Sequence, residues 1–540
     1  MSLTSGTNEL DDMPVGKVYL VGAGPGDVGL ITARALDVLA GADVVLYDAL
    51  ANSRLVALAP ESCERICVGK HGRRNQRGAD VAGVWSQAEI DDRLVAEARQ
   101  GKRVVRLKGG DPAIFGRLAE EVGRLTSEGI PFEIVPGITA ALAVTAYSGV
   151  PLTHRNYSSA VAFVTGQERP DTGSAKSEPA ASKLDYAALA AFPGTLVFYM
   201  GVTTAPQWAN QLIAHGKPAG TPCLAVRNVS LPTQRTWRRT LGEIPALLHP
   251  GSAVRPPVVV VVGEAAAHAP PAWWFTDRPL FGRTVLVTRP EHQAGDLVNA
   301  LEALGAETLS QPTIEIAPPA DWGPVDAAIA RLEEGAYDWL VFSSGNGVRS
   351  LLERLLDTGR DVRVLGGVRI AAMGPGTEAA LAEYCLSADV TPAEYRAESL
   401  AEALAARAAD RRFLLPRASR GRDVLPEALA AAGAMVEEIT VYESRDIAAA
   451  EPSIVARLQD GGIDFVTITS SSIARSLARL VGDALAKTRL VSISPVTSAT
   501  LRDLGLEPAA EASEYTMPGI VAAVRRLASD VAEHGANGRE

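Results

Sequence analysis

The chain of 540 residues is too long for a single hydrophobic core and predicts two to four domains. Its net charge of −11 disfavours a general nucleic-acid role, and no apolar stretch reaches the length of a membrane span. The N-terminal segment is polar and acidic and lacks the apolar core of a signal peptide. We therefore expect a cytoplasmic protein with no membrane or nucleic-acid partner.

Apolar runs and helical stretches alternate through the first half of the chain. The strand-like runs VYLVGA, DVVLYDA, VVRLKG and FEIVPG predict a mainly parallel α/β sheet. A second series begins at AVAFVTG and continues through LVFYMG, TPCLAVRN and PPVVVVVGE. We expect a flexible N-terminus at 1–16 and two α/β subdomains, 17–150 and 151–264, with a site between them.

Two glycine-rich turns interrupt the first series, VGAGPGDVGLIT at 21–32 and RLKGGDPAIFG at 106–116. Gly22, Gly24 and Gly26 remove side chains where a ligand can approach the backbone, while Pro25 stiffens the turn. One such turn alone is often an ordinary β–α connection, but two favour a ligand site. The third glycine comes one residue early for a dinucleotide fingerprint, so NAD binding is the minor alternative.

Eight sequence blocks in this half resemble the tetrapyrrole methyltransferase family, and within it the uroporphyrinogen-III C-methyltransferases. They lie between Lys17 and Glu264 and include VYLVGAGPGD, ADVVLYDAL, VVRLKGGDPAIFG, FEIVPGITAALA and LVFYMG. The resemblance implies S-adenosylmethionine as the methyl donor and acid/base roles for Asp48 and Lys70. It implies a cofactor pocket formed by Pro25, Gly109, Gly110, Asp111, Ile114, Thr139, Ala140 and Met200.

Several of these residues have a second interpretation. Asp111 before a proline can initiate a turn, Met200 can fill a core, Asp48 can cap a helix, and Lys70 can anchor a substrate carboxylate. Val229 stands where the family tends to have a glycine, and this difference affects only the backbone contact that the resemblance implies at that position. The cysteines and histidines form no cluster with metal-ligand spacing, so we expect no metal.

A boundary follows at 265–280, where prolines and a tryptophan pair interrupt the periodicity. From Phe281 to about Ala532 the alternation resumes and predicts open parallel sheets. The landmarks VLVTRP, WLVFSSGNGV, AAMGPGTEAAL, ITVYES, FVTITSSS and ISPVTSATLRDLGL resemble uroporphyrinogen-III synthase. We expect two lobes, 281–316 plus 443–532 and 317–442, and a flexible tail at 533–540.

This second resemblance implies closure of hydroxymethylbilane to uroporphyrinogen III with inversion of its last ring. The implied site residues are Thr377, Tyr442 and Thr497. The Tyr442 hydroxyl can donate a proton to the leaving hydroxide, although such a tyrosine can also serve only as a packing anchor. Serines at expected strand ends, where open α/β sheets place ligands, are Ser343, Ser344, Ser470 and Ser471.

The combined prediction is a bifunctional enzyme that makes uroporphyrinogen III and methylates it twice, through precorrin-1, to precorrin-2. This route leads to sirohaem or cobalamin. One alternative is a methylase acting on a later corrin intermediate. Another makes the second half a non-catalytic module for sensing or docking. Methylases of this type often pair, so a homodimer through the methylase domain is a further expectation.

Overall fold

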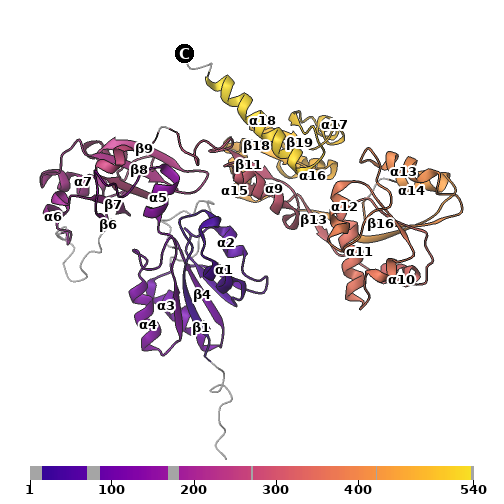
Figure 1. The fold of residues 1–540 in the computed structure, drawn as a ribbon, viewed down its shortest axis with the longest axis horizontal. Helices are drawn as coiled ribbons and strands as arrows, with labels where there is room; N and C mark the ends of the chain where they lie inside the picture. The colour runs from indigo at the N-terminus through magenta and orange to yellow at the C-terminus, as the bar shows by residue number, and fades with distance from the viewer. Residues whose placement is uncertain are drawn as a thin grey trace, which may run out of the picture. The chain divides into compact units, whose positions relative to one another are not determined.

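The computed structural model of the protein describes residues 15–69, 85–167, 182–268, 270, 272–420 and 423–536. The chain divides into two compact units, the first comprising Met1–Arg283 with Glu302–Glu307 and the second Thr284–Leu301 with Thr308–Glu540. Each unit holds two five-stranded sheets with helices packed against them (Figure 1). The α/β class predicted from the sequence is confirmed.

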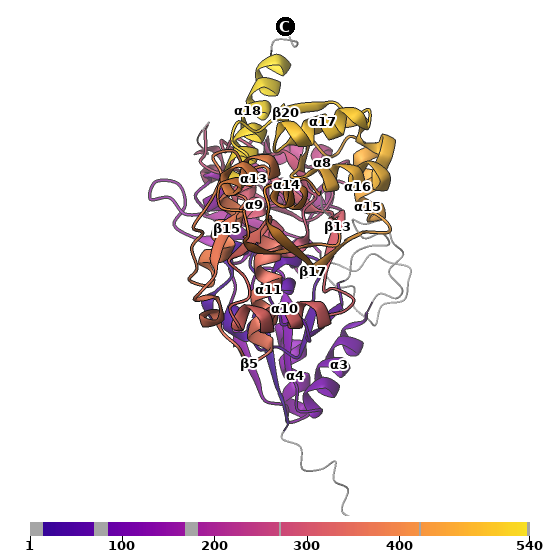
Figure 2. The same ribbon diagram turned by 90° about the vertical axis from the view of Figure 1, so that its right-hand side faces the viewer.

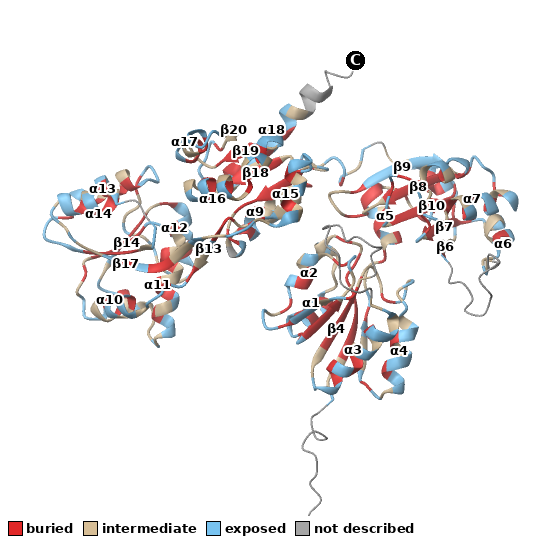
Figure 3. Cartoon of the chain, turned by 180° about the vertical axis from the view of Figure 1, so that it is seen from behind, coloured by how far each residue is buried: buried red, intermediate tan, exposed pale blue. Residues whose placement is uncertain are grey.

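The first sheet of unit 1 is wholly parallel, in the order β3-β2-β4-β1-β5. Its strands are β1 Lys17–Gly22, β2 Val44–Tyr47, β3 Glu64–Cys67, β4 Arg103–Lys108 and β5 Phe132–Val135. Its helices are α1 Ala33–Ala40, α2 Ser53–Ala57, α3 Gln87–Arg99 and α4 Leu118–Ser127. Because strand side chains alternate, Val18 and Leu20 pack with α3 and α4, whereas Val21 and Val105 pack with α1 and α2. Figure 3 shows the strands of this sheet buried, with α1 and α2 on one side and α3 and α4 on the other.

The second sheet of unit 1, for which the sequence analysis predicted no strand direction, is mixed. Its strands are β6 Val161–Thr165, β7 Thr195–Tyr199, β8 Pro222–Arg227, β9 Arg235–Thr240 and β10 Val258–Val262. In the order β6-β7-β10-β8-β9, β10 runs antiparallel to both neighbours, and β8 pairs antiparallel with β9. Strands β8 and β9 must pair antiparallel because their connection is short, whereas a parallel crossover needs a dozen or more residues. The helices are α5 Ala140–Ser148, α6 Tyr186–Ala191, α7 Ala205–Ala214 and α8 Ile244–Leu247.

Unit 2 contains two lobes. The outer lobe has the sheet order β12-β11-β18-β19-β20 and the middle lobe β13-β17-β16-β14-β15. The outer strands are β11 Thr284–Val287, β12 Glu307–Ser310, β18 Phe465–Ile468, β19 Arg489–Ser492 and β20 Pro508–Glu511. The middle strands are β13 Ile314–Ala317, β14 Trp339–Phe342, β15 Arg369–Ala372, β16 Arg412–Ala418 and β17 Met435–Asp446.

The helices of unit 2 follow the same division. Those of the outer lobe are α9 Glu291–Ala303, α15 Pro452–Gln459, α16 Ser471–Val481, α17 Pro495–Asp503 and α18 Met517–Ala536. Those of the middle lobe are α10 Gly323–Glu333, α11 Gly345–Asp357, α12 Pro375–Ala382, α13 Ala397–Ala405 and α14 Val424–Ala431. Helices α10 and α11 pack against β17 (Figure 2). Short 3₁₀ helices across both units are η1 Val28–Leu30, η2 Leu241–Glu243, η3 Glu264–His268, η4 Val362–Leu365 and η5 Gly482–Lys487.

The lobe boundary lies slightly outside the expected one. Strand β13 pairs antiparallel with the end of β17, Ile314 opposite Asp446 and Ala317 opposite Glu443. The middle-lobe sheet therefore extends from 314 to 446, whereas the sequence interpretation placed both ends of this range in the outer lobe. Within the described ranges, no helix combines the length and the apolar character that crossing a membrane requires.

Candidate functional site

The carboxyl ends of β1, β4 and β5 bring three turns of unit 1 together. After β1 and β4, Gly24 and Gly110 exchange two backbone hydrogen bonds, of 3.1 Å from the Gly24 N–H and 2.7 Å from the Gly110 N–H. The Asp111 carboxylate accepts a hydrogen bond of 2.9 Å from the N–H of Gly137, which follows β5. These turns carry Pro25, Gly109, Gly110, Asp111, Ile114, Thr139 and Ala140, all expected in the cofactor pocket.

The glycines in these turns serve different purposes. A Cβ on Gly22 would lie 2.6 Å from the Gly137 Cα, and one on Gly26 would lie 2.9 Å from the Leu231 side chain. The expectation that Gly22 and Gly26 open the backbone to a ligand is therefore wrong, because both permit close packing within the protein. Gly110 differs: its φ is +70°, and the nearest heavy atom to an added Cβ lies 3.8 Å away. A Cβ at Gly110 would thus meet the backbone of Thr139 and Ala140 only at ordinary van der Waals distance, and the positive φ is what favours glycine at this position.

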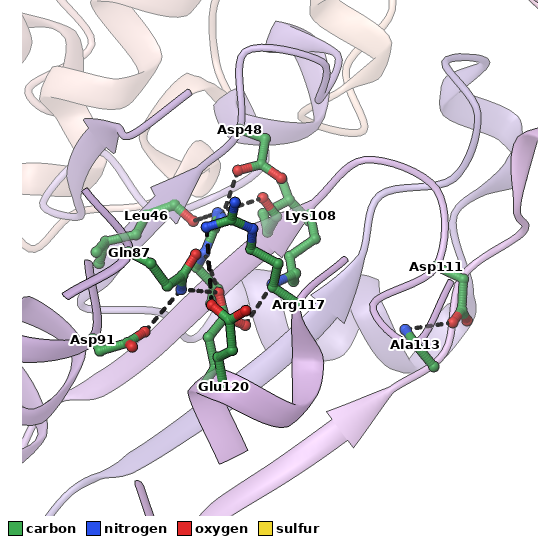
Figure 4. Close-up of polar contacts among 12 residues, drawn as sticks. Leu46, Asp48, Gln87, Asp91, Lys108, Asp111, Ala113, Arg117 and Glu120 are labelled. Carbon is green, nitrogen blue, oxygen red and sulfur yellow. Dashed lines mark hydrogen bonds and ion pairs between the residues drawn. The ribbon is translucent and has the colours of Figure 1, made fainter. Parts of the chain in front are cut away.

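Both oxygens of Asp111 are engaged by the backbone. One accepts the Gly137 N–H, and the other accepts the N–H of Ala113 at 2.8 Å (Figure 4). These bonds fix the turn between β4 and α4, as the turn-forming interpretation of Asp–Pro expects. The carboxylate retains further acceptor capacity, so its predicted role towards a cofactor stays a prediction.

An apolar group from the second subdomain adjoins these turns. The Tyr199 hydroxyl lies 2.7 Å from the Thr139 hydroxyl and accepts the Ala141 N–H at 2.9 Å, at the start of α5. The Phe115 ring lies 5.2 Å from the Tyr199 ring between centroids. Met200 follows Tyr199 with a φ of +53°, and the residue is 47% exposed. Its interpretation as core filler is therefore wrong, and its predicted place beside the cofactor remains open.

Asp48 lies at the carboxyl end of β2, beside a buried ionic cluster. The Arg106 guanidinium donates to Asp48 at 2.5 Å and to Glu121 at 3.2 Å. Glu121 also accepts a hydrogen bond from Lys108. The side chains of Arg106, Lys108 and Glu121 are 4%, 3% and 0% exposed, while that of Asp48 is 31% exposed. Two buried cations are thus compensated by a fully buried and a half-buried carboxylate.

Helix α3 adds further hydrogen bonds to this ionic cluster. Gln87 of α3 donates to Asp91 at 2.8 Å and to Glu121 at 3.4 Å, and Figure 4 shows Asp48, Gln87 and Lys108 gathered at this point. Burial lowers the pKa of Lys108, which Glu121 opposes. The cap of α2 is Asn52, which accepts the Arg54 N–H, so the interpretation of Asp48 as a helix cap is wrong. Arg106 instead fixes the Asp48 carboxylate at the strand end. Lys70, the other predicted acid/base residue, lies outside the described residues.

The two subdomains of unit 1 are also joined by polar contacts. The Tyr147 hydroxyl of α5 donates to Asp27 at 2.6 Å, and burial raises the pKa of Tyr147 above its ordinary value. The Asp27 N–H donates to the Ser230 hydroxyl at 3.0 Å. Val229, where the family tends to have a glycine, is buried between residues of positive φ, Asn228 and Ser230. This turn therefore supports the first glycine-rich turn from the opposite subdomain.

In unit 2, serines follow three parallel strands and cap the next helix. Ser344 caps α11, Ser470 caps α16 and Ser494 caps α17, each accepting a hydrogen bond of 3.2 to 3.4 Å from the N–H three residues on. Thr377 and Thr497 lie in the first turns of α12 and α17 and are 5% and 2% exposed. The predicted serines and threonines thus lie between strand ends and helix starts, where the first backbone N–H groups of a helix have no partner within the helix.

Tyr442 lies near the end of β17 and is 8% exposed. Its hydroxyl lies 3.1 Å from the Ser344 hydroxyl, and it also interacts with the Asn346 side chain. Burial raises the pKa of Tyr442 above 10.0, although both hydrogen bonds lower it. The structure brings Tyr442 to Ser344 in the middle lobe. In the described residues, no hydrogen bond joins Thr497 of the outer lobe to Tyr442 or to Thr377.

A polar chain that the sequence interpretation missed connects Tyr442 to the outer lobe. Asn346 accepts a hydrogen bond of 2.6 Å from Gln293 of α9. The Gln293 side-chain oxygen in turn accepts a hydrogen bond of 3.2 Å from Arg289, two residues beyond β11. We call Arg289, Gln293, Asn346 and Tyr442 the inter-lobe chain. The sequence signal for this chain was the polar residues that follow the strand-like runs VLV and FSS, since ligand sites of α/β sheets lie at strand ends.

Comparison with protein families gives two matches in one chain. The model of tetrapyrrole (corrin/porphyrin) methylases matches residues 17–245, and that of uroporphyrinogen-III synthase HemD matches residues 295–522. The two matches fall on the two structural units. The chain is therefore a fusion of a tetrapyrrole methylase with a uroporphyrinogen-III synthase, as the sequence motifs predicted.

Individual relatives refine this class. The porphyrin biosynthesis protein HemD of Ruminiclostridium josui is 33% identical over 513 residues, which cover 94% of this chain and 96% of that protein. The siroheme synthase of Tolumonas auensis is 43% identical over 279 residues, 52% of this chain and 55% of that protein. The chain thus spans about half the length of that siroheme synthase. The protein belongs to the family of the R. josui HemD protein, a porphyrin biosynthesis protein.

Solved structures match each half separately. The uroporphyrin-III C-methyltransferase of Thermus thermophilus in complex with S-adenosylhomocysteine is 39% identical, with a TM-score of 0.38, over 47% of this chain and 99% of that chain. A mutant uroporphyrinogen III synthase from the same bacterial species is 18% identical, with a TM-score of 0.36, over 46% of this chain and 99% of that chain.

Proposed function

We propose that unit 2 closes hydroxymethylbilane to uroporphyrinogen III with inversion of the last ring. Unit 1 then transfers two methyl groups from S-adenosylmethionine to this product, through precorrin-1 to precorrin-2. The observation that carries the proposal is the presence of a methylase region and a synthase region in one chain. The first reaction makes the substrate of the second, which disfavours a methylase acting on a later corrin intermediate.

The turns of unit 1 fit S-adenosylmethionine. Gly110 lies where three turns meet, and two exposed apolar residues, Phe115 and Met200, lie close to the Tyr199 ring that adjoins these turns. When bound, this molecule supplies an electrophilic methyl group on a positively charged sulfonium. Gly109 and Gly110 would hold the ligand against the backbone, with Met200 on its apolar side. Tyr199 holds the start of α5 in place through Thr139 and Ala141.

Asp48 supplies the proton-accepting group of unit 1. Carbon methylation of a pyrrole ring leaves a proton that must be removed to restore neutrality, and a fixed carboxylate at the edge of the site can accept it. Arg106 holds one Asp48 oxygen, and the side chain remains 31% exposed, so the carboxylate is both oriented and accessible. Lys70 is the proposed proton donor or carboxylate anchor.

Tyr442 supplies the proton-donating group of unit 2. Loss of hydroxide from hydroxymethylbilane gives an electrophilic azafulvene, which the substituted carbon of the last ring attacks through a spiro intermediate. A tyrosine phenol is protonated at neutral pH, and burial raises the pKa of Tyr442 further, so its O–H is present to donate to the departing hydroxide. Thr377, Thr497 and the N–H groups at the helix starts would position acetate and propionate arms.

The test supplies the purified chain with hydroxymethylbilane, with and without S-adenosylmethionine, and identifies products by mass and isomer analysis. We expect uroporphyrinogen III without the methyl donor and a gain of two methyl groups with it. Formation of isomer I alone, with methylation restored by added uroporphyrinogen III, would show that unit 2 is a non-catalytic sensing or docking module. Absence of methylation on uroporphyrinogen III would contradict the proposal for unit 1.

A further inference from the structure

Arg289 lies at the edge of the outer-lobe sheet that faces the middle lobe. Arg289 follows β11 and donates a hydrogen bond to Gln293. Gln293 in turn donates a hydrogen bond to Asn346 in the first turn of α11. The charge of Arg349, also on α11, acts on Arg289. Contacts from two lobes thus converge on this guanidinium.

The partners of Arg289 are neutral. Its nitrogens donate to the backbone and side-chain oxygens of Gln293, each at 3.2 Å, and approach the Met517 sulfur at 3.2 Å. Among the described residues, no carboxylate forms an ion pair with Arg289, and Asp296 acts on it only at longer range. Arg349 is itself held by Glu383. Burial is the main cause that lowers the pKa of Arg289, and the Arg349 charge adds to it.

Such an arrangement is unfavourable in the free protein. A cation removed from water is stabilised only when a nearby anion compensates it, and neutral amide oxygens do so incompletely. A second arginine close by raises the electrostatic energy further. A ligand carboxylate entering between the lobes would supply the missing charge, and a guanidinium binds such a group through two parallel hydrogen bonds.

We propose that Arg289 is the binding residue for one carboxylate arm of the tetrapyrrole, placed so that the arm is held next to Tyr442. This inference rests on the proposed synthase function and deepens it. Hydroxymethylbilane and uroporphyrinogen III carry acetate and propionate arms around their rings, so a carboxylate is available wherever the ring is seated. Gln293 and Asn346 connect Arg289 to Tyr442 through hydrogen bonds, which fixes the anchored arm relative to the phenol.

The experiment compares the full chain with R289M, R289K and R363M. Methionine removes the charge and keeps an extended side chain, and lysine keeps the charge without the paired donors. Arg363 is a matched control because its side chain is 89% exposed and pairs with Asp361 on the surface. We expect R289M to raise the KM for hydroxymethylbilane by about tenfold to a hundredfold, because the substitution removes a charge-assisted hydrogen bond. The change in kcat should be smaller. R289K should fall between R289M and the wild type, and R363M should match the wild type.

Thermal unfolding and titration with uroporphyrinogen III separate binding from structural support. Because R289M removes an uncompensated cation, its melting temperature without ligand should equal or exceed that of the wild type, while its affinity for uroporphyrinogen III falls. A KM within twofold of the wild type would overturn the proposal. So would a lower melting temperature that parallels the rise in KM. If the wild type forms no uroporphyrinogen III yet R289M weakens its binding, the carboxylate site stands and the catalytic proposal for unit 2 fails.

Discussion

Carboxylates compensate the buried positive charges of unit 1, whereas the buried positive charge of Arg289 in unit 2 has only neutral hydrogen-bond partners in the described part of the chain. In unit 1, Arg106 and Lys108 are almost fully buried, and Glu121 and Asp48 compensate them. In unit 2, Arg289 is partly buried and contacts only neutral partners among the described residues. Compensated charges fix the geometry of a site before any ligand arrives. An uncompensated charge indicates where the ligand itself completes the electrostatics.

The largest expected effect comes from breaking the compensation in unit 1. E121Q leaves Arg106 and Lys108 without their shared buried carboxylate, which should destabilise unit 1 by about 3–5 kcal/mol. Calorimetry of the full chain should show a lower melting temperature for the transition of unit 1. The neighbouring E120Q is the control, because the Glu120 side chain is 44% exposed and pairs with Arg117 at 3.9 Å. Equal effects of the two substitutions would contradict this account of the cluster.

Removing the accessible member of the cluster should impair catalysis. D48N keeps the size of the side chain but cannot accept the proton, and we expect methyl transfer to slow by roughly a hundredfold or more. The rate is measured by mass analysis of methylated product from supplied uroporphyrinogen III. Formation of uroporphyrinogen III from hydroxymethylbilane should be unchanged, and D37N, on the exposed surface of α1, is the control. Wild-type methylation by D48N would exclude Asp48 as the base.

The corresponding change in unit 2 is Y442F. Loss of the phenolic proton donor should slow formation of uroporphyrinogen III by about tenfold to a hundredfold. Methylation of supplied uroporphyrinogen III should continue at the wild-type rate. Y395F in the same lobe is the control, since Tyr395 is 48% exposed. Because burial raises the pKa of Tyr442 above 10.0, the wild-type rate should not fall through its deprotonation between about pH 7 and pH 9.

The smallest effect concerns an exposed ion pair and its dependence on pH. Lys17 and Arg34 hold Glu133, and their hydrogen bonds lower its pKa from 4.5 to about 2. A carboxyl with a depressed pKa in the folded state stabilises the protein above pH 4.5, and this contribution is lost as the pH falls towards 2. E133Q should therefore flatten the pH dependence of the unit 1 melting temperature over this interval. An unchanged slope would show that the contacts contribute little in solution.

Regular strands and strand-end turns could be predicted from the sequence because their signals are local. The apolar runs predicted β1, β2, β4 and β5, and the glycine-rich turns followed directly from them. Helix α4 begins only at Leu118, because Phe115 and Arg117 adopt positive φ. The direction of β10 could not be predicted, because α7, β9 and α8 lie in the sequence between β10 and its partners β7 and β8.

The polar clusters could be predicted only in part, because they depend on distant residues. Glu121 occupies a helix whose charges are typical of a solvent-facing surface, and only the packing of α4 on β4 buries it. The inter-lobe chain joins Arg289 and Asn346 from different lobes, so no local pattern connects them. The family resemblances pointed to Asp48 and Tyr442, but the partners of these residues depend on the folded chain.

The outer lobe is assembled from two stretches of sequence that the whole middle lobe separates. Strand β11 lies between β12 and β18, and Val285 pairs with Phe465. During synthesis, β11 therefore cannot pair with β18 until the ribosome has also made the whole middle lobe. The middle lobe, whose strands are contiguous from 314 to 446, can fold first and bring the two stretches together. A chain truncated before β18 would retain a complete middle-lobe sheet and an apolar β11 with its main partner missing, a species prone to aggregate.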